Sequence, residues 1–422
     1  MNKIYYIFLA SFFIASCSKD DPSFFQTDEE GVIISQSYLW KSSLHENNIF
    51  RSNGYVEFPV VYNENILIPI TDSEGNKYLS MINSGNGKIE WKWNDILYES
   101  FNNDVELYGL YKRNNLLTWQ HGGRSYCINL KDGNTEWKLQ RDFSFHSKLF
   151  GNDNIYYSLG NPEKYIGYDI LLGYKGNIQT GEIEEFLEPD FSFEYSIGTR
   201  MCDVTEIVPF EINGVKHLVV VYQELTSNTI WNFQSFLGLY NEETNEWVYD
   251  RKVMNEPNLN GVSLAPPVIY NNRFYANIGH ELVCHDISTG EQIWKKQFEQ
   301  DFMFSGFIIE EDKIIANNED LKLYCLNPET GSIIWVGEGA GTCSRMSYLN
   351  GIVYFVGGGD GDFHAVDISN GETVWRIDAK KIEGNEALFK TNAVYVIPGG
   401  NGEKGKVIAL THMYAYCFEA YK

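Results

Sequence analysis

A motif of fixed spacing returns along this chain and limits the folds that are open to it. The motif reads Asx-x-x-x-Gly-x-x-x-Trp, and its clearest copies cover residues 286–294, 327–335 and 367–375, with tryptophans 41 and 40 residues apart. Two more copies cover residues 83–91 and 129–137. A period of about 40 to 50 residues is typical of propellers and solenoids. The motif positions in these five copies are Asn83, Gly87, Trp91, Asn129, Gly133, Trp137, Asp286, Thr289, Gly290, Trp294, Asn327, Thr330, Gly331, Trp335, Asp367, Gly371 and Trp375.

Two looser copies fill the gap between the upstream pair and the downstream three. In one of them Asn177 and Gly181 keep the turn, but Glu185 stands at the tryptophan position. In the other, Asn241 keeps the turn, and Trp247 arrives two residues early. Seven copies of the turn therefore divide most of the chain.

Each position of the motif has a physical role in a strand–turn–strand unit. The Asp or Asn side chain accepts hydrogen bonds from turn amides, and the glycine supplies the positive φ that closes the turn. The tryptophan begins the next strand, where burial of its ring between neighbouring sheets contributes roughly 3 kcal/mol. Apolar residues make up 43% of the chain and aromatic residues 15%, which suits half-buried strands. Apolar runs before the turns predict hairpins, so each repeat is expected to be a four-stranded sheet.

The repeated motif resembles the tryptophan-docking motif of the pyrroloquinoline-quinone-like β-propellers, the family of the quinoprotein alcohol dehydrogenases. The resemblance covers nearly everything after residue 35. The same family includes the propeller lipoprotein of the bacterial β-barrel assembly machinery, to which this chain is closer in length and in its lipid-anchor signal. The resemblance implies an all-β propeller and leaves the choice between these members open.

The two ends of the repeat are unequal, and this difference predicts how the ring closes. An eighth set of strands follows residue 387, and the chain stops where a turn and a tryptophan strand would come next. Residues 32–41 form a strand that contains Trp40 but has no hairpin partner before it. Pairing the first strand with the last would remove open sheet edges. The sequence therefore predicts an eight-bladed β-propeller of four-stranded antiparallel blades, with the N-terminal strand and Trp40 closing the last blade.

The N-terminus is typical of an exported lipoprotein. Lys3 precedes an apolar run over residues 4–15, which is too short to span a bilayer but suits the core of a signal peptide. The run leads to Cys17 through small residues, which resembles the bacterial lipobox; a cleaved signal with an incidental cysteine is the alternative. We expect a signal peptide over 1–16, the lipidated Cys17 and a flexible tether over 17–31, and the propeller over 32–422.

The residues that follow the cysteine bear on the membrane leaflet. Ser18 in place of aspartate implies the outer membrane rather than retention at the inner membrane. Residues 19–22, Lys-Asp-Asp-Pro, resemble the surface-export tag of Bacteroidetes lipoproteins, although a short acidic tether would look the same. The expected location is therefore the outer membrane, with exposure at the cell surface favoured by the tag.

The net charge of the chain and the placement of its histidines and cysteines argue against nucleic-acid, metal and cofactor binding. The formal net charge of −24 repels polyanions, so nucleic acid is not an expected partner. The loop over 357–362 and the histidines are expected to serve turns and packing, so no metal site and no cofactor is predicted. Cys202 and Cys343 have no assigned role. Four cysteines share one repeated strand position and are expected to be small apolar fillers rather than disulfide or metal ligands: Cys127, Cys284, Cys325 and Cys417.

Three function classes remain, and the sequence favours the first. The favoured class is a non-catalytic scaffold that binds an outer-membrane or other envelope protein, because the adjacent cysteines and the haem motif of the quinoprotein dehydrogenases are missing from the sequence. A quinone-dependent dehydrogenase is the enzymatic alternative, and a surface propeller that binds or cleaves glycans is the third. Aromatics in an insertion of the fourth blade, Trp231 and Phe233, are the predicted partner contacts.

Overall fold

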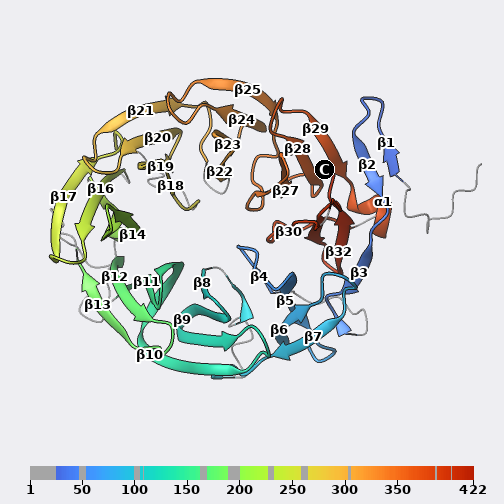
Figure 1. The fold of residues 1–422 in the computed structure, drawn as a ribbon, viewed down its shortest axis with the longest axis horizontal. Helices are drawn as coiled ribbons and strands as arrows, with labels where there is room; N and C mark the ends of the chain where they lie inside the picture. The colour runs from blue at the N-terminus through green and yellow to red at the C-terminus, as the bar shows by residue number, and fades with distance from the viewer. Residues whose placement is uncertain are drawn as a thin grey trace, which may run out of the picture.

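The structure, a computed structural model, is a ring of eight blades arranged around a central axis (Figure 1). This confirms the predicted eight-bladed propeller of four-stranded antiparallel blades. The structure describes residues 25–46, 54–98, 105–107, 109–161, 169–188, 200–226, 232–257, 265–302, 306–384, 387–400 and 402–422, without the side chains of 142–148, 169–171 and 200–203. Cys17 and Trp231 lie outside the described residues.

Five blades have four strands that follow one another from the axis to the rim. Blade 1 consists of β4 (Val61–Tyr62), β5 (Asn65–Thr71), β6 (Lys77–Ile82) and β7 (Ile89–Trp93). Blade 5 consists of β18 (Val268–Tyr270), β19 (Arg273–Ile278), β20 (Glu281–Asp286) and β21 (Gln292–Gln297). Blade 6 consists of β22 (Phe307–Glu310), β23 (Lys313–Asn318), β24 (Lys322–Leu326) and β25 (Ile333–Glu338). Blade 7 consists of β26 (Ser347–Leu349), β27 (Ile352–Val356), β28 (Phe363–Asp367) and β29 (Thr373–Ile377). Blade 8 consists of β30 (Tyr395–Ile397), β31 (Lys406–Leu410), β32 (Tyr414–Glu419) and β3 (Trp40–Ser43).

Blades 2 to 4 are joined by shared and long strands. Their strands are β8 (Leu110–Arg113), β9 (Leu116–Asn129), β10 (Thr135–Asn152), β11 (Ile155–Asn161), β12 (Asp169–Asn177), β13 (Ile183–Leu187), β14 (Arg200–Ile212), β15 (Val215–Leu225), β16 (Phe233–Asn241) and β17 (Glu246–Val253). β10 pairs with β9 at its start and with β11 at its end, so one strand serves blades 2 and 3. A short parallel pairing of β12 with β14 connects blades 3 and 4.

The hydrophobic core lies between blades rather than within one of them. Each buried apolar cluster draws its side chains from consecutive blades, as Ile314 of blade 6 and Cys284 of blade 5 do in one cluster. The strands alternate their side chains between the two faces of a blade, so each blade contributes to two clusters. All five cysteines with described side chains are buried and free, and burial raises the pKa of the Cys127 thiol to about 12. The four repeated cysteines are therefore apolar fillers.

The N-terminal segment closes the ring as predicted, but with fewer residues. Trp40 pairs with Cys417 of β32, and β3 is the outermost strand of blade 8. β2 (Ile33–Gln36), which was expected to belong to the same closing strand, instead pairs in parallel with β29 of blade 7 through Ile33 and Trp375. The strand predicted over 32–41 is thus divided between two blades.

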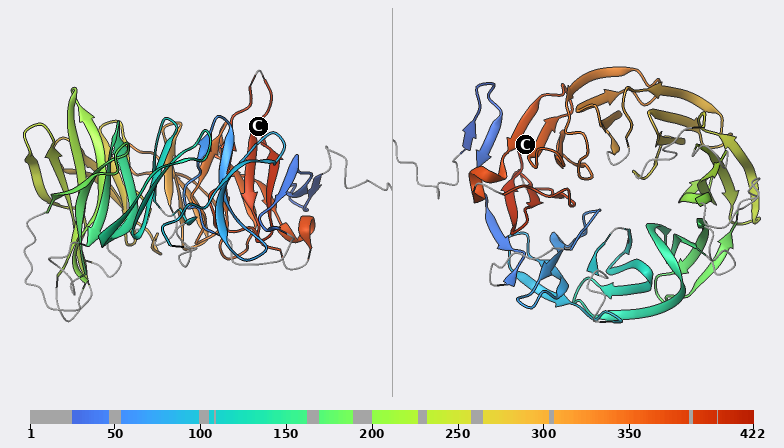
Figure 2. Two further views of the ribbon diagram at one scale, coloured as in Figure 1. Left: turned by 90° about the horizontal axis from the view of Figure 1, so that it is seen from below. Right: turned by 180° about the vertical axis from the view of Figure 1, so that it is seen from behind.

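An additional hairpin lies outside blade 7. β1 (Phe25–Thr27) pairs with β2, and the turn between them is held by the Asp28 carboxylate, which accepts the amide of Val32 at 2.9 Å. Figures 1 and 2 show this hairpin at the rim of the disc. Residues 25–31, which were expected to be part of the flexible tether, contain β1 and the turn that joins it to β2. The short helix α1 (Ala379–Glu383) leads from blade 7 to blade 8. None of the helices in the described ranges is both long and apolar enough to cross a membrane.

Candidate functional site

The tryptophans of the repeat join each blade to the next. The ring of Trp294 lies against the turn of blade 6, where a Cβ added at Gly331 would be 2.6 Å from its Cε3 atom. Its indole Nε1 donates a hydrogen bond to the carbonyl of Pro328 at 2.9 Å. The φ of Gly331 is +67°, and its amide bonds the Asn327 carbonyl at 2.8 Å. Glycine is therefore needed at position 331 for two reasons: the backbone has a positive φ, and the Trp294 ring leaves no room for a Cβ atom.

The same contact recurs at five other seams. At each of them an aromatic side chain donates to the carbonyl that follows the Asx residue of the next turn. The donor–acceptor pairs are Trp40 with Ser84, Trp91 with Leu130, Trp137 with Ile178, Trp335 with Ile368, and Tyr249 with Ile287. Trp40 makes this contact with blade 1, so it closes the ring both by strand pairing and by docking.

Blade 4 docks through a residue that the sequence analysis missed. Trp247, the predicted motif residue, packs on Tyr240 at a ring-centroid distance of 5.4 Å within its own blade. Tyr249 takes the docking position, and its hydroxyl reaches Ile287 of blade 5 at 2.9 Å. Asn245 stands in the place of the turn glycine with a φ of +54°. Counting four residues on from Asn245 would have identified Tyr249.

Two seams differ from the rest. Between blades 3 and 4, where Glu185 replaces the tryptophan, Glu242 of the blade 4 turn accepts hydrogen bonds from Tyr157 at 2.7 Å and Lys175 at 3.2 Å. Between blades 7 and 8, Trp375 is 1% exposed and packs on Tyr421 of the C-terminal tail. The tail therefore stands in for the missing eighth turn.

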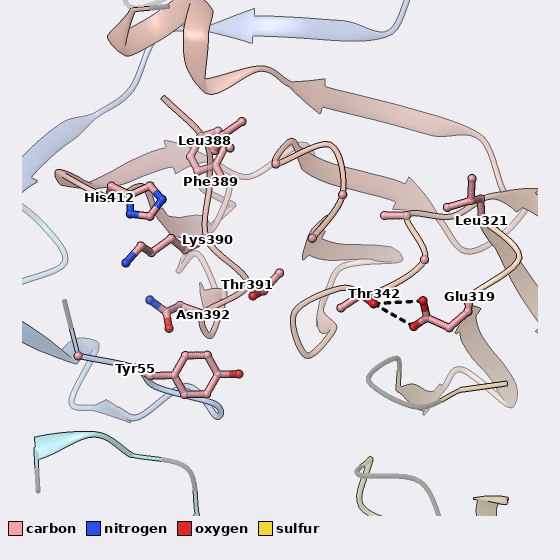
Figure 3. Close-up of a pocket in the computed structure, with 16 residues that line it drawn as sticks. Tyr55, Glu319, Leu321, Thr342, Leu388, Phe389, Lys390, Thr391, Asn392 and His412 are labelled. Carbon is pink, nitrogen blue, oxygen red and sulfur yellow. Dashed lines mark hydrogen bonds between the residues drawn. The ribbon is translucent and has the colours of Figure 1, made fainter. Parts of the chain in front are cut away.

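A cavity of about 790 Å³ opens on one face of the ring between blades 6, 7, 8 and 1. Figure 3 shows its lining, which comes from loops that connect the second and third strands of a blade or lead to the next blade. The glycine-rich loop predicted as a hairpin turn, over residues 357–362, joins β27 to β28 and supplies part of the wall. The lining residues that Figure 3 labels are Tyr55, Glu319, Leu321, Thr342, Leu388, Phe389, Lys390, Thr391, Asn392 and His412. The cavity therefore collects side chains from segments far apart in the sequence.

One wall of the cavity is formed by three consecutive polar residues, Lys390, Thr391 and Asn392. The backbone of Lys390 is fixed by its amide, which donates to the Leu410 carbonyl at 2.8 Å. The Oδ1 atom of Asn392 accepts the amide of Val56 at 3.3 Å, and this side chain is 3% exposed. Within the part of the chain that the structure describes, the Lys390 ammonium, the Thr391 hydroxyl and the Asn392 Nδ2 atom have no hydrogen-bond partner. The wall thus presents unused hydrogen-bond donors to the cavity.

The surroundings of Lys390 lower its own pKa and the pKa of two nearby histidines. Burial lowers the pKa of Lys390, the nearby Lys77 lowers it further, and Glu106 opposes these effects. Burial also lowers the pKa of His412 and of His45, and the Lys390 charge adds to the lowering of each. Lys77 itself is paired with Glu106 at 2.7 Å. Lys390 itself has no ion-pair partner among the described residues, although Glu106 lies near enough to raise its pKa.

The opposite wall of the cavity is acidic but engaged. The Thr342 hydroxyl donates to the Glu319 carboxylate at 3.1 to 3.2 Å, as the dashed lines in Figure 3 mark. Leu321 and Leu388, at the mouth, are 64% and 37% exposed. The cavity therefore combines a cationic wall, a carboxylate wall and apolar surface between them.

Near the inner edge of the ring, an ion pair links distant segments. The guanidinium of Arg345, which precedes blade 7, donates from Nε to the Glu57 carboxylate at 3.1 Å and also through Nη2. The guanidinium lies 5.4 Å from the ring centroid of Phe58. This pair connects blade 7 to blade 1 across the axis side. Among the described residues, no group of three His, Cys, Asp or Glu side chains is placed to hold a metal ion.

The comparisons with known proteins agree with the repeat. A family model described as outer membrane protein assembly factor BamB matches residues 216–420. BamB of Shewanella oneidensis is 26% identical over 128 residues, which cover 27% of this chain and 32% of that protein. The chain thus spans about a third of the length of this relative.

Solved structures show the same fold at low identity. BamB from Moraxella catarrhalis superposes with a TM-score of 0.55 and 12% identity, covering 88% of this chain and 99% of that one. A quinohemoprotein alcohol dehydrogenase from Pseudomonas putida superposes with a TM-score of 0.59 and 10% identity, covering 90% of this chain and 76% of that one. Likeness at this identity shows the fold alone. The chain is an eight-bladed β-propeller, and its residues 216–420 are similar to the BamB family.

Of the two predicted partner contacts, the structure describes only Phe233, since Trp231 lies outside the described residues. Phe233, the first residue of β16, pairs with Leu225 of β15 and is 8% exposed, so its ring is not exposed as expected. The reason is that the insertion extends the β15–β16 ladder, so Phe233 lies within a strand and not in an exposed loop.

Exposed apolar residues lie instead on the outer strands of the propeller. On β25, Ile333, Ile334 and Val336 are 40%, 51% and 50% exposed. A groove of about 580 Å³ separates the end of this strand from the β1–β2 hairpin, where Phe25 is 58% exposed. Ile333, Ile334, Val336 and Phe25 are called the rim patch below.

Proposed function

We propose that this protein is a non-catalytic, lipid-anchored scaffold of the outer membrane, which holds an envelope protein through the rim of its propeller. The observation that carries this proposal is the match of residues 216–420 to the outer membrane protein assembly factor family. The lipobox-like sequence before Cys17 supports an anchor, and a rigid closed ring suits a role in positioning a partner. The identity of the envelope partner is left to the experiment.

The rim patch is the surface that we assign to the partner. Outer strands are the open edges of the blades, and an unpaired edge is a template for another strand. The chain itself uses this property at blade 7, where β2 adds to β29. β25 of the adjacent blade 6 ends its sheet within the described residues and exposes Ile334 and Val336 on that edge strand. A strand from the partner is the occupant that fits this edge.

Copurification tests the scaffold role. Tagged full-length protein should be extracted from envelope membranes in mild detergent with one envelope protein in stoichiometric amount. Replacing Ile334 and Val336 by lysine should reduce the yield of that partner by about tenfold or more, because two lysines oppose burial of the apolar edge. The matched control replaces Val248 and Val253 on β17, which are 51% and 57% exposed, and should retain the partner. Recovery of the protein alone from cross-linked membranes would contradict the proposal.

Lipidation at Cys17 is a separate prediction. The Cys17→Ser variant should lack the acyl chains and accumulate as an uncleaved or soluble precursor, because the lipobox thiol is the site of acylation. Incorporation of a labelled fatty acid and membrane fractionation measure both effects. Acylated, membrane-bound product from the serine variant would show that the anchor is elsewhere. Protease treatment of intact cells then tests whether the Lys19–Asp20–Asp21 segment directs the protein to the surface.

A further inference from the structure

We propose that the cavity between blades 6, 7, 8 and 1 binds an acidic saccharide, with the carboxylate of a uronic acid held by Lys390 and Asn392. This inference goes beyond the scaffold role and concerns a different surface from the rim patch. It rests on the cavity, on its unused donors and on the charge of its wall.

The cavity wall carries three side-chain hydrogen-bond donors, on Lys390, Thr391 and Asn392. Polar groups that open to a cavity are satisfied there by water or by a ligand. Asn392 is 3% exposed and anchored through Oδ1, and its Nδ2 atom, which has no partner among the described residues, is not fully enclosed and faces the cavity that the residue lines. Lys390 and Thr391 stand beside it and are equally unpaired within the described part of the chain. An ammonium, an amide and a hydroxyl on adjacent residues match a ligand rich in acceptor oxygens.

The charge of the site selects the kind of acceptor. The protein as a whole carries a formal net charge of −24, but this cavity has a lysine, Lys390, in its lining. Lys77 is paired with Glu106, whereas Lys390 has no ion-pair partner among the described residues. One positive charge balances a monoanion better than it balances a phosphate dianion. A carboxylate is the monoanion that accepts two hydrogen bonds side by side.

The rest of the cavity fits a sugar better than a simple carboxylate. Its volume of about 790 Å³ falls in the range of small-molecule sites. Leu321 and Leu388 offer apolar surface at the mouth, and the Tyr55 ring lies on the wall beside Asn392 (Figure 3). The Glu319 carboxylate across the cavity is an acceptor for ligand hydroxyls. Hydroxyl groups and an apolar ring face are both features of a pyranose.

The lysine also carries a cost that folding alone does not explain. Because burial lowers its pKa, the charged form is less stable in the folded protein than in the unfolded chain. This penalty is fully present below the folded-state pKa and disappears as the pH rises above the unfolded value. A stable fold would therefore gain from losing this charge, whereas a ligand site would need it.

Calorimetric titration of the full chain tests the proposal. The probes are tetragalacturonate, the neutral maltotetraose and sodium acetate. We expect binding of tetragalacturonate alone, weakening as salt is added, and a loss of affinity of about tenfold to a hundredfold in Lys390→Met. The matched control, Lys381→Met, removes an exposed lysine of helix α1 outside the cavity and should bind as the unchanged protein does.

A second measurement separates a binding defect from misfolding. The thermal midpoint of Lys390→Met should equal or exceed that of the unchanged protein, because the charge that is removed is half-buried and has no ion-pair partner among the described residues. Equal affinity for tetragalacturonate in both lysine variants would overturn the proposal, as would equal binding of acetate or maltotetraose. A lowered midpoint together with lost binding would also overturn it, since Lys390 would then be structural. Partner copurification through the rim patch is read independently of all these results.

Discussion

Replacing Trp40 by alanine should lower the free energy of unfolding by about 3 to 5 kcal/mol, because it opens the seam between the last blade and the first. The ring of Trp40 is 7% exposed and covers Gly87, and its Nε1 donates to Ser84 at 2.7 Å. Alanine removes this burial, leaves a cavity against the blade 1 turn and deprives a carbonyl of its donor. The loss is large beside the 5 to 15 kcal/mol that is typical of a folded domain.

Urea unfolding followed by tryptophan fluorescence measures this effect, and the neighbouring residue supplies the control. Leu39 precedes Trp40 but is 52% exposed, so Leu39→Ala should change the free energy of unfolding by no more than about 0.5 kcal/mol. Both variants keep the β3–β32 backbone pairing. A Trp40→Ala protein as stable as Leu39→Ala would mean that the ring is closed by backbone pairing alone.

The fold was predictable because the repeat encodes it locally. Each turn requires an Asx acceptor, a glycine of positive φ and an aromatic ring to cover that glycine, and these requirements leave a fixed spacing in the sequence. The same logic placed Trp40 at the closing seam. The prediction that Trp247 docks on the next blade was wrong because a tyrosine hydroxyl can replace an indole N–H as the donor. The Tyr249 hydroxyl donates to the Ile287 carbonyl at 2.9 Å.

Other features left no comparable signal. The β1–β2 hairpin adds a parallel strand to blade 7 through only one aligned pair, Ile33 with Trp375, and so short a pairing imposes no pattern on the sequence. Phe233 was expected on the surface because an insertion usually forms an exposed loop, whereas here the insertion extends a ladder. The cavity combines Tyr55, Glu319 and Lys390, which are brought together only when the ring closes. No local spacing could have identified that set.

Replacing Gly331 by alanine should lower the free energy of unfolding by about 2 to 5 kcal/mol, from two separable causes. Alanine at a φ of +67° costs about 1 to 2 kcal/mol in backbone conformation. Its Cβ would also lie 2.6 Å from Cε3 and 2.8 Å from Cδ2 of Trp294, so the indole must move away from the turn. Overpacking of this kind costs about 1 to 3 kcal/mol, and the displaced Nε1 would lose its 2.9 Å hydrogen bond to Pro328.

A Gly214→Ala variant distinguishes the cost of the backbone conformation from the cost of the clash with the ring. Gly214 has a φ of +82° in the turn between β14 and β15, but an added Cβ would meet nothing within 4 Å. Gly214→Ala should therefore show the conformational cost alone, about 1 to 2 kcal/mol. The difference between the two variants, measured by urea unfolding under the same conditions, gives the contribution of the tryptophan contact. Equal losses would show that the ring of Trp294 is not held against the next turn, and the docking contact would then contribute little to joining the blades.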